Sequence, residues 1–279
     1  MAMDLKAAIQ YGCCVLAAEN ITPSDLTNRA GTVMQIGPPS NLVNYNVVAS
    51  IYGNDLDMAA KANTKDATLF VSFGLVLQSP TNDVVIAIRG TNGFFEWLQD
   101  ADFPLIVCPF LAGAGKTEMG FTDVYQSLCM APAVGSPKLV SALAGLPFRL
   151  PVSSVTICGH SLGGALVTLL GLDVGANTRF KQPAVYSYAS PRTGDPPFVA
   201  TYNQVVPTSF RLANRFDVVP GLPPAAFGYG HVDTFVDLKP GLEVKIDPLC
   251  RHHLTTYLYV LGKMAGVAGL PLNSDCQFL

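Results

Sequence analysis

Hydrophobic and polar positions change their period several times along the 279-residue chain, and each period predicts an element. In residues 3–19, apolar side chains recur at helical spacing, so this segment is predicted to be a helix facing the core. Residues 67–78 and 83–89 alternate as strands. Because residues 79–82 (SPTN) between them are typical of a turn, the two strands are predicted to form a hairpin.

The second half of the chain alternates between short apolar runs and helical segments. The predicted elements are strands at 153–158, 184–189 and 205–212, and helices at 162–173 and 252–262. Strands that alternate with helices are typical of an α/β sheet. Since internal repeats, low-complexity tracts and Ser-rich linkers are absent, we expect a single domain over residues 1–279.

One apolar stretch, residues 150–172, contains no Asp, Glu, Lys or Arg and is long enough to span a bilayer. A Gly-His-Ser turn at its middle would leave backbone groups unpaired in lipid, so we expect a buried strand, a tight turn and a helix, and no transmembrane segment. The N-terminus lacks the basic region and continuous apolar core of a signal peptide. Whether the protein is secreted or cytoplasmic is left open.

Composition narrows the class of protein. Hydrophobic residues make up 49% of the chain and charged residues 13%, which excludes a disordered chain and a coiled coil. Seventeen basic and twenty acidic residues give a net charge of −3, so no basic excess favours nucleic-acid binding. The seven cysteines show no zinc-binding spacing, and we expect buried thiols. One disulfide near the C-terminus, involving Cys276, is left open.

Residues 113–117 (GAGKT) follow an apolar run and resemble part of a phosphate-binding loop. That motif needs a glycine five positions before Gly115, where this chain has Phe110. We therefore expect a flexible loop here and no bound nucleotide.

A more specific motif is G-x-S-x-G at residues 159–163 (GHSLG). A predicted strand precedes it and a predicted helix follows it, which is the context that a nucleophilic serine on a sharp turn requires. Glycines on both sides of Ser161 avoid the clashes of such a turn, and the start of a helix favours developing negative charge. Ser161 is therefore the candidate nucleophile.

A serine nucleophile needs a base and a third group that orients the base, and in this arrangement the acid precedes the histidine along the chain. Asp217 follows a predicted strand, where the catalytic groups of such sheets gather, although it could instead form a salt bridge with Arg211 or Arg215. Asp195 is interpreted as a helix N-cap, and Asp233 is a further acid in a loop.

Three histidines follow Ser161 in the sequence. His231 lies only fourteen residues after Asp217 and is interpreted as structural. His252 and His253 open the last predicted helix, late in the chain as the order requires. Both remain candidates for the base at this point.

Taken together, these motifs resemble the lipase class 3 family, the fungal-lipase-like α/β-hydrolases, from about residue 69 to residue 258. Four motifs stand in the family's order: 85–91 (VIAIRGT), 159–165 (GHSLGGA), 188–195 (YASPRTGD) and 214–224 (NRFDVVPGLPP). The resemblance implies an α/β-hydrolase fold, with a central, mostly parallel sheet flanked by helices and a short helical lid over the active site.

The resemblance also implies roles for individual residues. Ser161 would be the nucleophile and Asp217 the acid. The family's pattern around the catalytic base can be matched in two ways. The form H-x-apolar-x-x-Tyr fits His252, and the form His-Leu fits His253. We favour His252, since the apolar residue and the tyrosine of the pattern then keep the helical phase, and His253 is the alternative base.

The oxyanion hole is expected from the backbone N–H of Leu162 and from Thr91, whose hydroxyl can add a second donor. Asp100 matches a family position that orients this hydroxyl. In similar lipases a short helix after Thr91 is the lid. A helix from residue 94 to residue 100 would show an apolar face at i, i+3 and i+4. The predicted lid and substrate-binding residues are Phe94, Phe95, Trp97 and Leu98.

An apolar lid favours long-chain acyl esters, so the sequence predicts a triacylglycerol lipase acting at a lipid–water interface. The alternatives are a carboxylesterase or a phospholipase A1 with the same triad, and a non-catalytic lipase-like scaffold that binds lipid or protein. No metal, cofactor or protein partner is implied.

Overall fold

The computed structural model describes residues 2–54, 69–91 and 102–278. The predicted lid residues Phe94, Phe95, Trp97 and Leu98, together with Asp100, lie outside the described residues, and their roles stay predictions.

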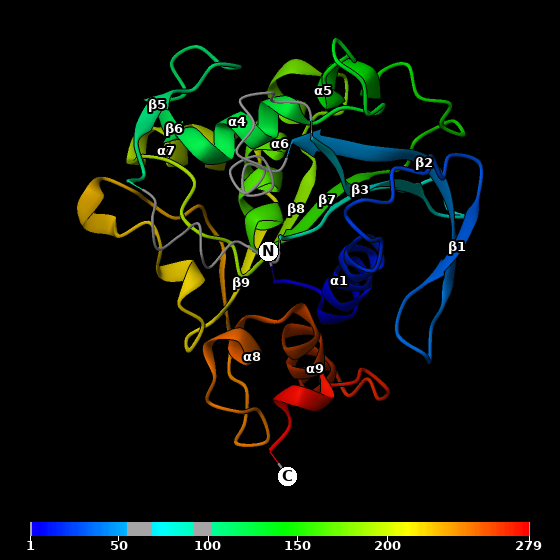
Figure 1. Cartoon of the computed structure of the whole chain (residues 1–279), viewed down its shortest axis with the longest axis vertical. Helices are drawn as coiled ribbons and strands as arrows, with labels where there is room; N and C mark the ends of the chain where they lie inside the picture. Colours follow the sequence, from blue (N-terminus) through cyan, green and yellow to red (C-terminus); the bar gives the residue numbers. More distant parts are fainter. Residues whose placement is uncertain (1, 55–68, 92–101, 279) are drawn as a thin grey trace.

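An eight-stranded sheet forms the centre of the described chain, in the order β1-β2-β3-β4-β7-β8-β9-β10 (Figure 1). Its strands are β1 (Val33–Ile36), β2 (Val43–Asn54), β3 (Phe70–Gln78), β4 (Val84–Ile88), β7 (Val155–His160), β8 (Ala184–Tyr188), β9 (Ser209–Asn214) and β10 (Phe235–Leu238). Strands β1 to β4 pair antiparallel, whereas β4 to β10 pair parallel. The predicted parallel arrangement is thus found in the half of the sheet that carries the motifs.

Helices cover both faces of the sheet. They are α1 (Leu5–Glu19), α4 (Met119–Ser127), α5 (Leu139–Leu143), α6 (Leu162–Asn177), α7 (Pro196–Val205), α8 (Pro248–His252) and α9 (Leu254–Ala265), with 3-10 turns η1 (Val219–Gly221), η2 (Ala225–Phe227) and η3 (Ser274–Cys276). Helices α1 and α9 pack together on one face, and α4, α5 and α6 pack on the other (Figure 1). Two apolar layers, one on each side of the sheet, therefore form the core.

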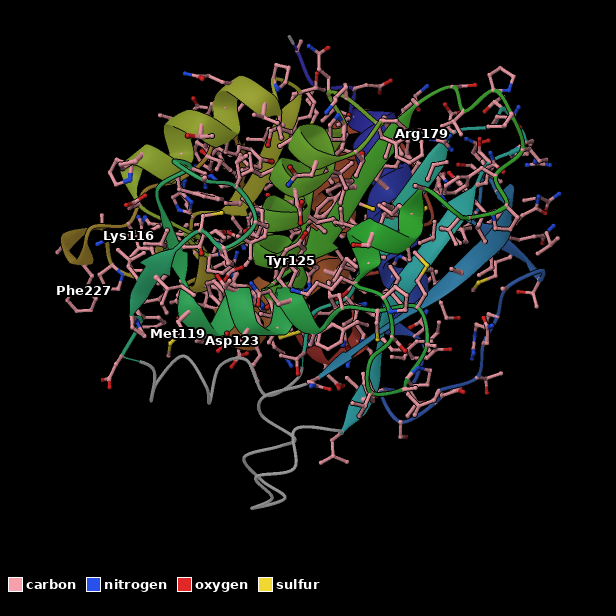
Figure 2. All side chains as sticks on the ribbon, turned by 90° about the horizontal axis from the view of Figure 1, so that it is seen from above. Lys116, Met119, Asp123, Tyr125, Arg179 and Phe227 are labelled. Carbon is pink, nitrogen blue, oxygen red and sulfur yellow. A yellow bond between two sulfur atoms is a disulfide. The ribbon has the colours of Figure 1, made fainter. Side chains whose placement is uncertain are left out.

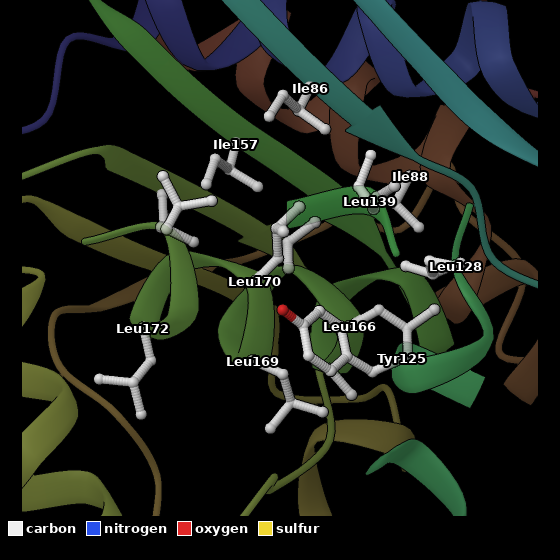
Figure 3. Close-up of a cluster of buried hydrophobic side chains, with 14 of the residues drawn as sticks. Ile86, Ile88, Tyr125, Leu128, Leu139, Ile157, Leu166, Leu169, Leu170 and Leu172 are labelled. Atoms are coloured by element: carbon white, nitrogen blue, oxygen red, sulfur yellow. The ribbon is translucent and has the colours of Figure 1, made fainter. Parts of the chain in front are cut away.

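Helix α6 explains the long apolar stretch of the sequence. All residues from 162 to 175 are buried, because the sheet lies on one side of this helix and other helices lie around it. Figure 3 shows leucines of α6 between the isoleucines of β4 and β7 and Tyr125 of α4. Within the described ranges, no helix combines the length and the apolarity that a bilayer span requires.

Helix α4 illustrates how an amphipathic element covers this core. Tyr125 points inward and donates a hydrogen bond to the buried carboxylate of Asp173, 2.5 Å away. Met119 and Asp123, from the same helix, lie at the outer edge (Figure 2).

The segment that resembled a phosphate-binding loop joins the two strands of a small antiparallel hairpin, β5 (Leu105–Val107) and β6 (Lys116–Glu118). Gly113 and Gly115 adopt φ of +77° and +89°, a left-handed conformation that glycine adopts without strain. The expected loop is therefore a β-hairpin, and its lysine belongs to a strand.

Two predicted elements differ from the structure. The strand expected at 205–212 begins only at Ser209, because residue 205 still belongs to α7. The helix expected at 252–262 is interrupted at His253, which has extended backbone angles and separates α8 from α9.

A disulfide joins Cys250 to Cys276 and ties α8 to the C-terminal segment. The other five cysteines are buried thiols, as expected.

Candidate active site

Ser161 sits on a sharp turn between β7 and α6. Its φ of +58° is unfavourable for a residue with a side chain, and such strain costs about 1–3 kcal/mol. The turn also approaches neighbouring backbone closely. A Cβ on Gly163 would lie 2.5 Å from the carbonyl oxygens of Ile88 and Arg89. The motif thus contains glycine because β4 leaves no space for a side chain.

A chain of hydrogen bonds links the three predicted triad residues. The Nε2 atom of His252 lies 2.7 Å from Oγ of Ser161, and its Nδ1 atom lies 2.8 Å from Oδ2 of Asp217. All three residues are buried. Because a carboxylate only accepts, Nδ1 carries the proton of the neutral ring and Nε2 is left to accept the proton of the serine.

The neighbouring His253 is exposed and lies at the break between α8 and α9. It lines the same cavity as Ser161, but the hydrogen bonds to Ser161 and Asp217 come from His252. Of the two candidates for the base, the geometry therefore favours His252.

The carboxylate of Asp217 is held by groups that the sequence pattern did not assign to it. Tyr257 of α9 donates its hydroxyl to Oδ2 at 2.7 Å, and the backbone N–H of Val219 donates to Oδ1 at 3.0 Å. Arg215, an alternative partner for Asp217, instead pairs with Asp237. In the sequence, Tyr257 entered only as the tyrosine of the pattern H-x-apolar-x-x-Tyr that begins at His252. The structure shows that this tyrosine contacts Asp217.

Burial lowers the pKa of His252, and the carboxylate of Asp217 opposes this effect by favouring the imidazolium. The net direction is downward, so His252 is neutral at neutral pH. A neutral imidazole is the form that can accept the serine proton.

The two predicted oxyanion donors flank Ser161. Leu162 is the first residue of α6, where backbone N–H groups lack partners within the helix. Thr91 follows β4 and lines the cavity beside Ser161. The backbone before Thr91 approaches closely, since a Cβ on Gly90 would lie 3.0 Å from Cβ of Ser161.

A cavity of about 290 Å³ opens over Ser161. It is lined by the ends of α1, β4, β7 and α8, through Leu16, Glu19, Asn20, Pro23, Arg89, Gly90, Thr91, His160, Ser161, Leu249, His252 and His253. The lining mixes apolar and polar side chains. In the described part of the chain, no group of three or more His, Cys, Asp or Glu residues is arranged to hold a metal ion.

The other candidate residues lie elsewhere. Asp195 caps α7 by accepting from the N–H of Phe198, as the N-cap interpretation predicts. His231 has a ring nitrogen 2.7 Å from the carbonyl oxygen of Pro220, and burial lowers its pKa to about 3. Asp233 accepts a hydrogen bond from Asn203. These hydrogen bonds all go to residues outside the triad.

A half-parallel sheet that carries a serine between a strand and a helix, with an acid and a histidine supplied later in the chain, defines an α/β-hydrolase. The chain belongs to the lipase (class 3) family, whose model matches residues 85–227. The family that the sequence motifs resembled is thereby confirmed.

Similar proteins of known sequence include phospholipase A1-II 3 of Oryza sativa subsp. japonica, which is 29% identical over 72% of this chain and 54% of its own length. A lipase of Rhizomucor miehei is 33% identical over 53% of this chain and 39% of its own length. The chain therefore spans about half, or less, of the length of these curated relatives.

Solved structures show the same fold. A mono- and diacylglycerol lipase from Aspergillus oryzae matches with a TM-score of 0.61 and 22% identity, over 84% of this chain and 80% of the other. A propeptide complex of Rhizomucor miehei lipase matches with a TM-score of 0.52 and 30% identity, over 59% of this chain and 51% of the other. The α/β-hydrolase fold that the sequence predicted is confirmed.

Proposed function

We propose that this chain is a serine carboxylic-ester hydrolase and, more narrowly, a triacylglycerol lipase that acts at lipid–water interfaces. The observation that carries the proposal is the continuous hydrogen-bonded path from Ser161 through His252 to Asp217, at 2.7 and 2.8 Å. Membership of the lipase (class 3) family supports the same chemistry.

Hydrolysis proceeds in two acyl transfers. Oγ of Ser161 attacks the ester carbonyl carbon while Nε2 of His252 takes the serine proton, and Asp217 stabilises the imidazolium. The C–O bond to the alcohol then breaks, the alcohol leaves with the proton from His252, and an acyl-serine remains. Water, deprotonated by the same imidazole, attacks this acyl group and releases the carboxylic acid and the serine hydroxyl.

During both attacks, negative charge develops on the carbonyl oxygen. The N–H of Leu162 and the Thr91 side of the cavity would donate hydrogen bonds to this oxygen. Loss of one such donor typically raises the barrier by about 2.7–4 kcal/mol.

Exposed apolar residues near the site support a lipid substrate. Leu249, which lines the cavity, is 57% exposed, and Phe216 and Val218 on either side of Asp217 are also exposed. Single exposed apolar residues are common, but Leu249 belongs to the lining of the cavity, where it can contact an acyl chain. The predicted lid would add Phe94, Phe95, Trp97 and Leu98 to this surface.

A phospholipase A1 is the second candidate, with a carboxylesterase on the same triad beside it. Several relatives named phospholipase A1-II cover about 70% of this chain, and the cavity carries the polar side chains of Asn20 and His253. Such groups could contact a polar head group. A non-catalytic scaffold is disfavoured by the intact path of hydrogen bonds.

The initial rate of tributyrin hydrolysis, measured across the solubility limit, tests the proposal. We expect a rise in rate once droplets form, and loss of at least about 10⁴-fold in Ser161→Ala with unchanged thermal unfolding. A saturating curve below the limit would indicate an esterase. Faster release of the sn-1 acyl chain from phosphatidylcholine vesicles would indicate a phospholipase A1, and an equal rate in Ser161→Ala would refute the site.

A further inference from the structure

A second buried histidine lies directly beside the proposed base. His160 is the last residue of β7, and its ring centroid is 4.8 Å from that of His252. Its Nε2 atom is 2.8 Å from the backbone carbonyl oxygen of His252, and its Nδ1 atom is 2.9 Å from Oε1 of Glu19. Glu19 is the last residue of α1. The ester hydrolysis proposed above does not use either residue.

The hydrogen-bond partners determine how many protons this pair holds. A carbonyl oxygen only accepts, so Nε2 of His160 carries a proton and donates it to His252. A carboxylate and an unprotonated ring nitrogen would repel each other at 2.9 Å, so a further proton lies between Nδ1 of His160 and Glu19. The pair is therefore neutral as a whole, whichever partner holds that proton.

The environment favours the ion pair over its neutral form. Burial would lower the pKa of His160, but the charge and the hydrogen bond of Glu19, together with the carbonyl oxygen of His252 and the charge of Asp217, raise it overall. Burial would likewise raise the pKa of Glu19, but His160 and a hydrogen bond from the backbone of Gly90 lower it. Both directions favour the form in which His160 is the imidazolium and Glu19 is its counter-ion.

Several charged or titratable groups face the ring of His252. Asp217 and Ser161 bind its two nitrogens, while the cation of His160 and the carboxylate of Glu19 lie behind it. Tyr257 of α9 adds its hydroxyl, through Asp217. On the same cavity wall, Arg89 donates to the carbonyl oxygens of Ser72 and Gly90, and His253 faces outward.

We propose that Glu19 and His160 are positioning residues for the base: as a charge-balanced pair they hold the main chain of His252 and set the electrostatic field at its imidazole. The proposal rests on the proposed ester hydrolysis. During that reaction His252 becomes a cation 4.8 Å from a second cation, and Glu19 supplies the negative charge that offsets this repulsion.

The charge effect predicts a direction for the pH dependence. The activity requires neutral His252 and is lost as pH falls through its pKa in the folded protein. The cation of His160 lowers that pKa and the carboxylate of Glu19 raises it. Replacing His160 by a neutral residue removes the cation and leaves the carboxylate of Glu19, so the pKa of His252 rises. The acid limb of the pH profile, where activity falls as the pH is lowered, must therefore move to higher pH.

The main test is the pH profile of kcat/KM for a soluble ester, p-nitrophenyl butyrate. In His160→Gln the glutamine amide can still donate to the carbonyl of His252, while the charge is lost. We expect the acid limb to rise by about 0.5–1 pH unit and kcat to fall about tenfold or more. In the double variant Glu19→Gln/His160→Gln, the limb should return toward that of the wild type.

Glu243→Gln is the matched control, because Glu243 forms an ion pair with Lys263 at the surface, away from the triad. Its pH profile should equal that of the wild type. If His160→Gln lowers the melting temperature but leaves the acid limb in place, the pair is merely structural and the proposal is wrong.

A second measurement needs no activity. In protein labelled with ¹⁵N-histidine, the spectrum contains four histidines, and the signals of His160 are those that vanish in His160→Gln. At neutral pH we expect both its ring nitrogens to be protonated in the wild type, and one to lose its proton in Glu19→Gln. A neutral His160 in the wild type would overturn the proposal, whereas absence of Ser161-dependent hydrolysis would refute only the ester hydrolysis on which it rests.

Discussion

The turn that carries Ser161 and the helix that carries His252 are held in place by different kinds of interaction. The turn is fixed by backbone contacts, because Gly163 packs against the carbonyl oxygens at the end of β4. Helix α8 is fixed by side-chain hydrogen bonds and a disulfide. We therefore expect even one added methyl group in the turn to destabilise the protein strongly. Removing the contacts of α8 one at a time should reduce stability and activity gradually.

Side-chain hydrogen bonds join α8 to other segments of the chain. Arg251 donates to the carbonyl oxygens of Val244 and Lys245, and the side chain of Asn214 donates to the carbonyl oxygen of Arg251. The Cys250–Cys276 disulfide adds a covalent link only two residues before His252. Several separate contacts therefore hold the helix that carries His252, and each of them can be removed by mutation.

The largest effect is expected from removing the base itself. His252→Ala should lower kcat/KM for tributyrin by about 10⁴-fold or more, because the serine then has no proton acceptor. His253→Ala should lose less than about tenfold, since its side chain lines the cavity without bonding to Ser161. The reverse result would move the base by one residue and contradict the geometry of α8.

Gly163→Ala tests the rigidity of the turn. The added Cβ would lie 2.5 Å from two backbone oxygens, so the turn or β4 must shift. We expect a loss of about 3 kcal/mol or more in the free energy of unfolding, measured by denaturant titration. Gly145→Ala is the matched control, because its Cβ would meet only one oxygen, at 3.7 Å. Equal stabilities of the two variants would show that the turn is not fixed by this contact.

The double variant Cys250→Ala/Cys276→Ala tests the covalent link of α8. Opening a loop of this size is expected to cost about 3 kcal/mol in the free energy of unfolding. Activity at a temperature where the variant remains folded should fall as well, because α8 carries His252. Full activity in the folded variant would show that Arg251 and Asn214 hold the helix without the disulfide.

The difference between the two regions also explains what the sequence could predict. The turn of Ser161 was predicted at the right place, although β7 ends two residues later than expected, because its strand, its glycines and its helix are contiguous in the chain. For the base, the residues alone left His252 and His253 open, and only the family's pattern favoured His252. Their distinction depends on the break between α8 and α9 at His253, which the sequence pattern did not predict.

Other parts of the fold carried no local signal. Strands β1, β2 and β10 and helices α4 and α5 were not predicted, although the order of the parallel strands follows the predicted alternation. In β2 most residues are buried, so the strand lacks a clear alternation of apolar and polar positions. Glu19 also gave no signal, since its partner His160 is 141 residues away in the sequence.

The smallest expected effect comes from Tyr257, whose hydroxyl donates to Asp217 and accepts from the backbone N–H of Asn214. Tyr257→Phe keeps the ring and removes both hydrogen bonds, so one buried N–H and one carboxylate oxygen each lose a partner. We expect a loss of about 1–3 kcal/mol in the free energy of unfolding and a fall of about tenfold in kcat.

Tyr259→Phe is a suitable control for this change, because Tyr259 lies on the same helix and stacks with Lys263 at the surface. Stability and kcat should both be nearly unchanged there. If Tyr257→Phe lowers stability but leaves kcat as it was, the tyrosine supports the fold of α9 without orienting the acid. The orientation of His252 would then depend on the Asp217 carboxylate and on α8, without a contribution from the hydroxyl of Tyr257.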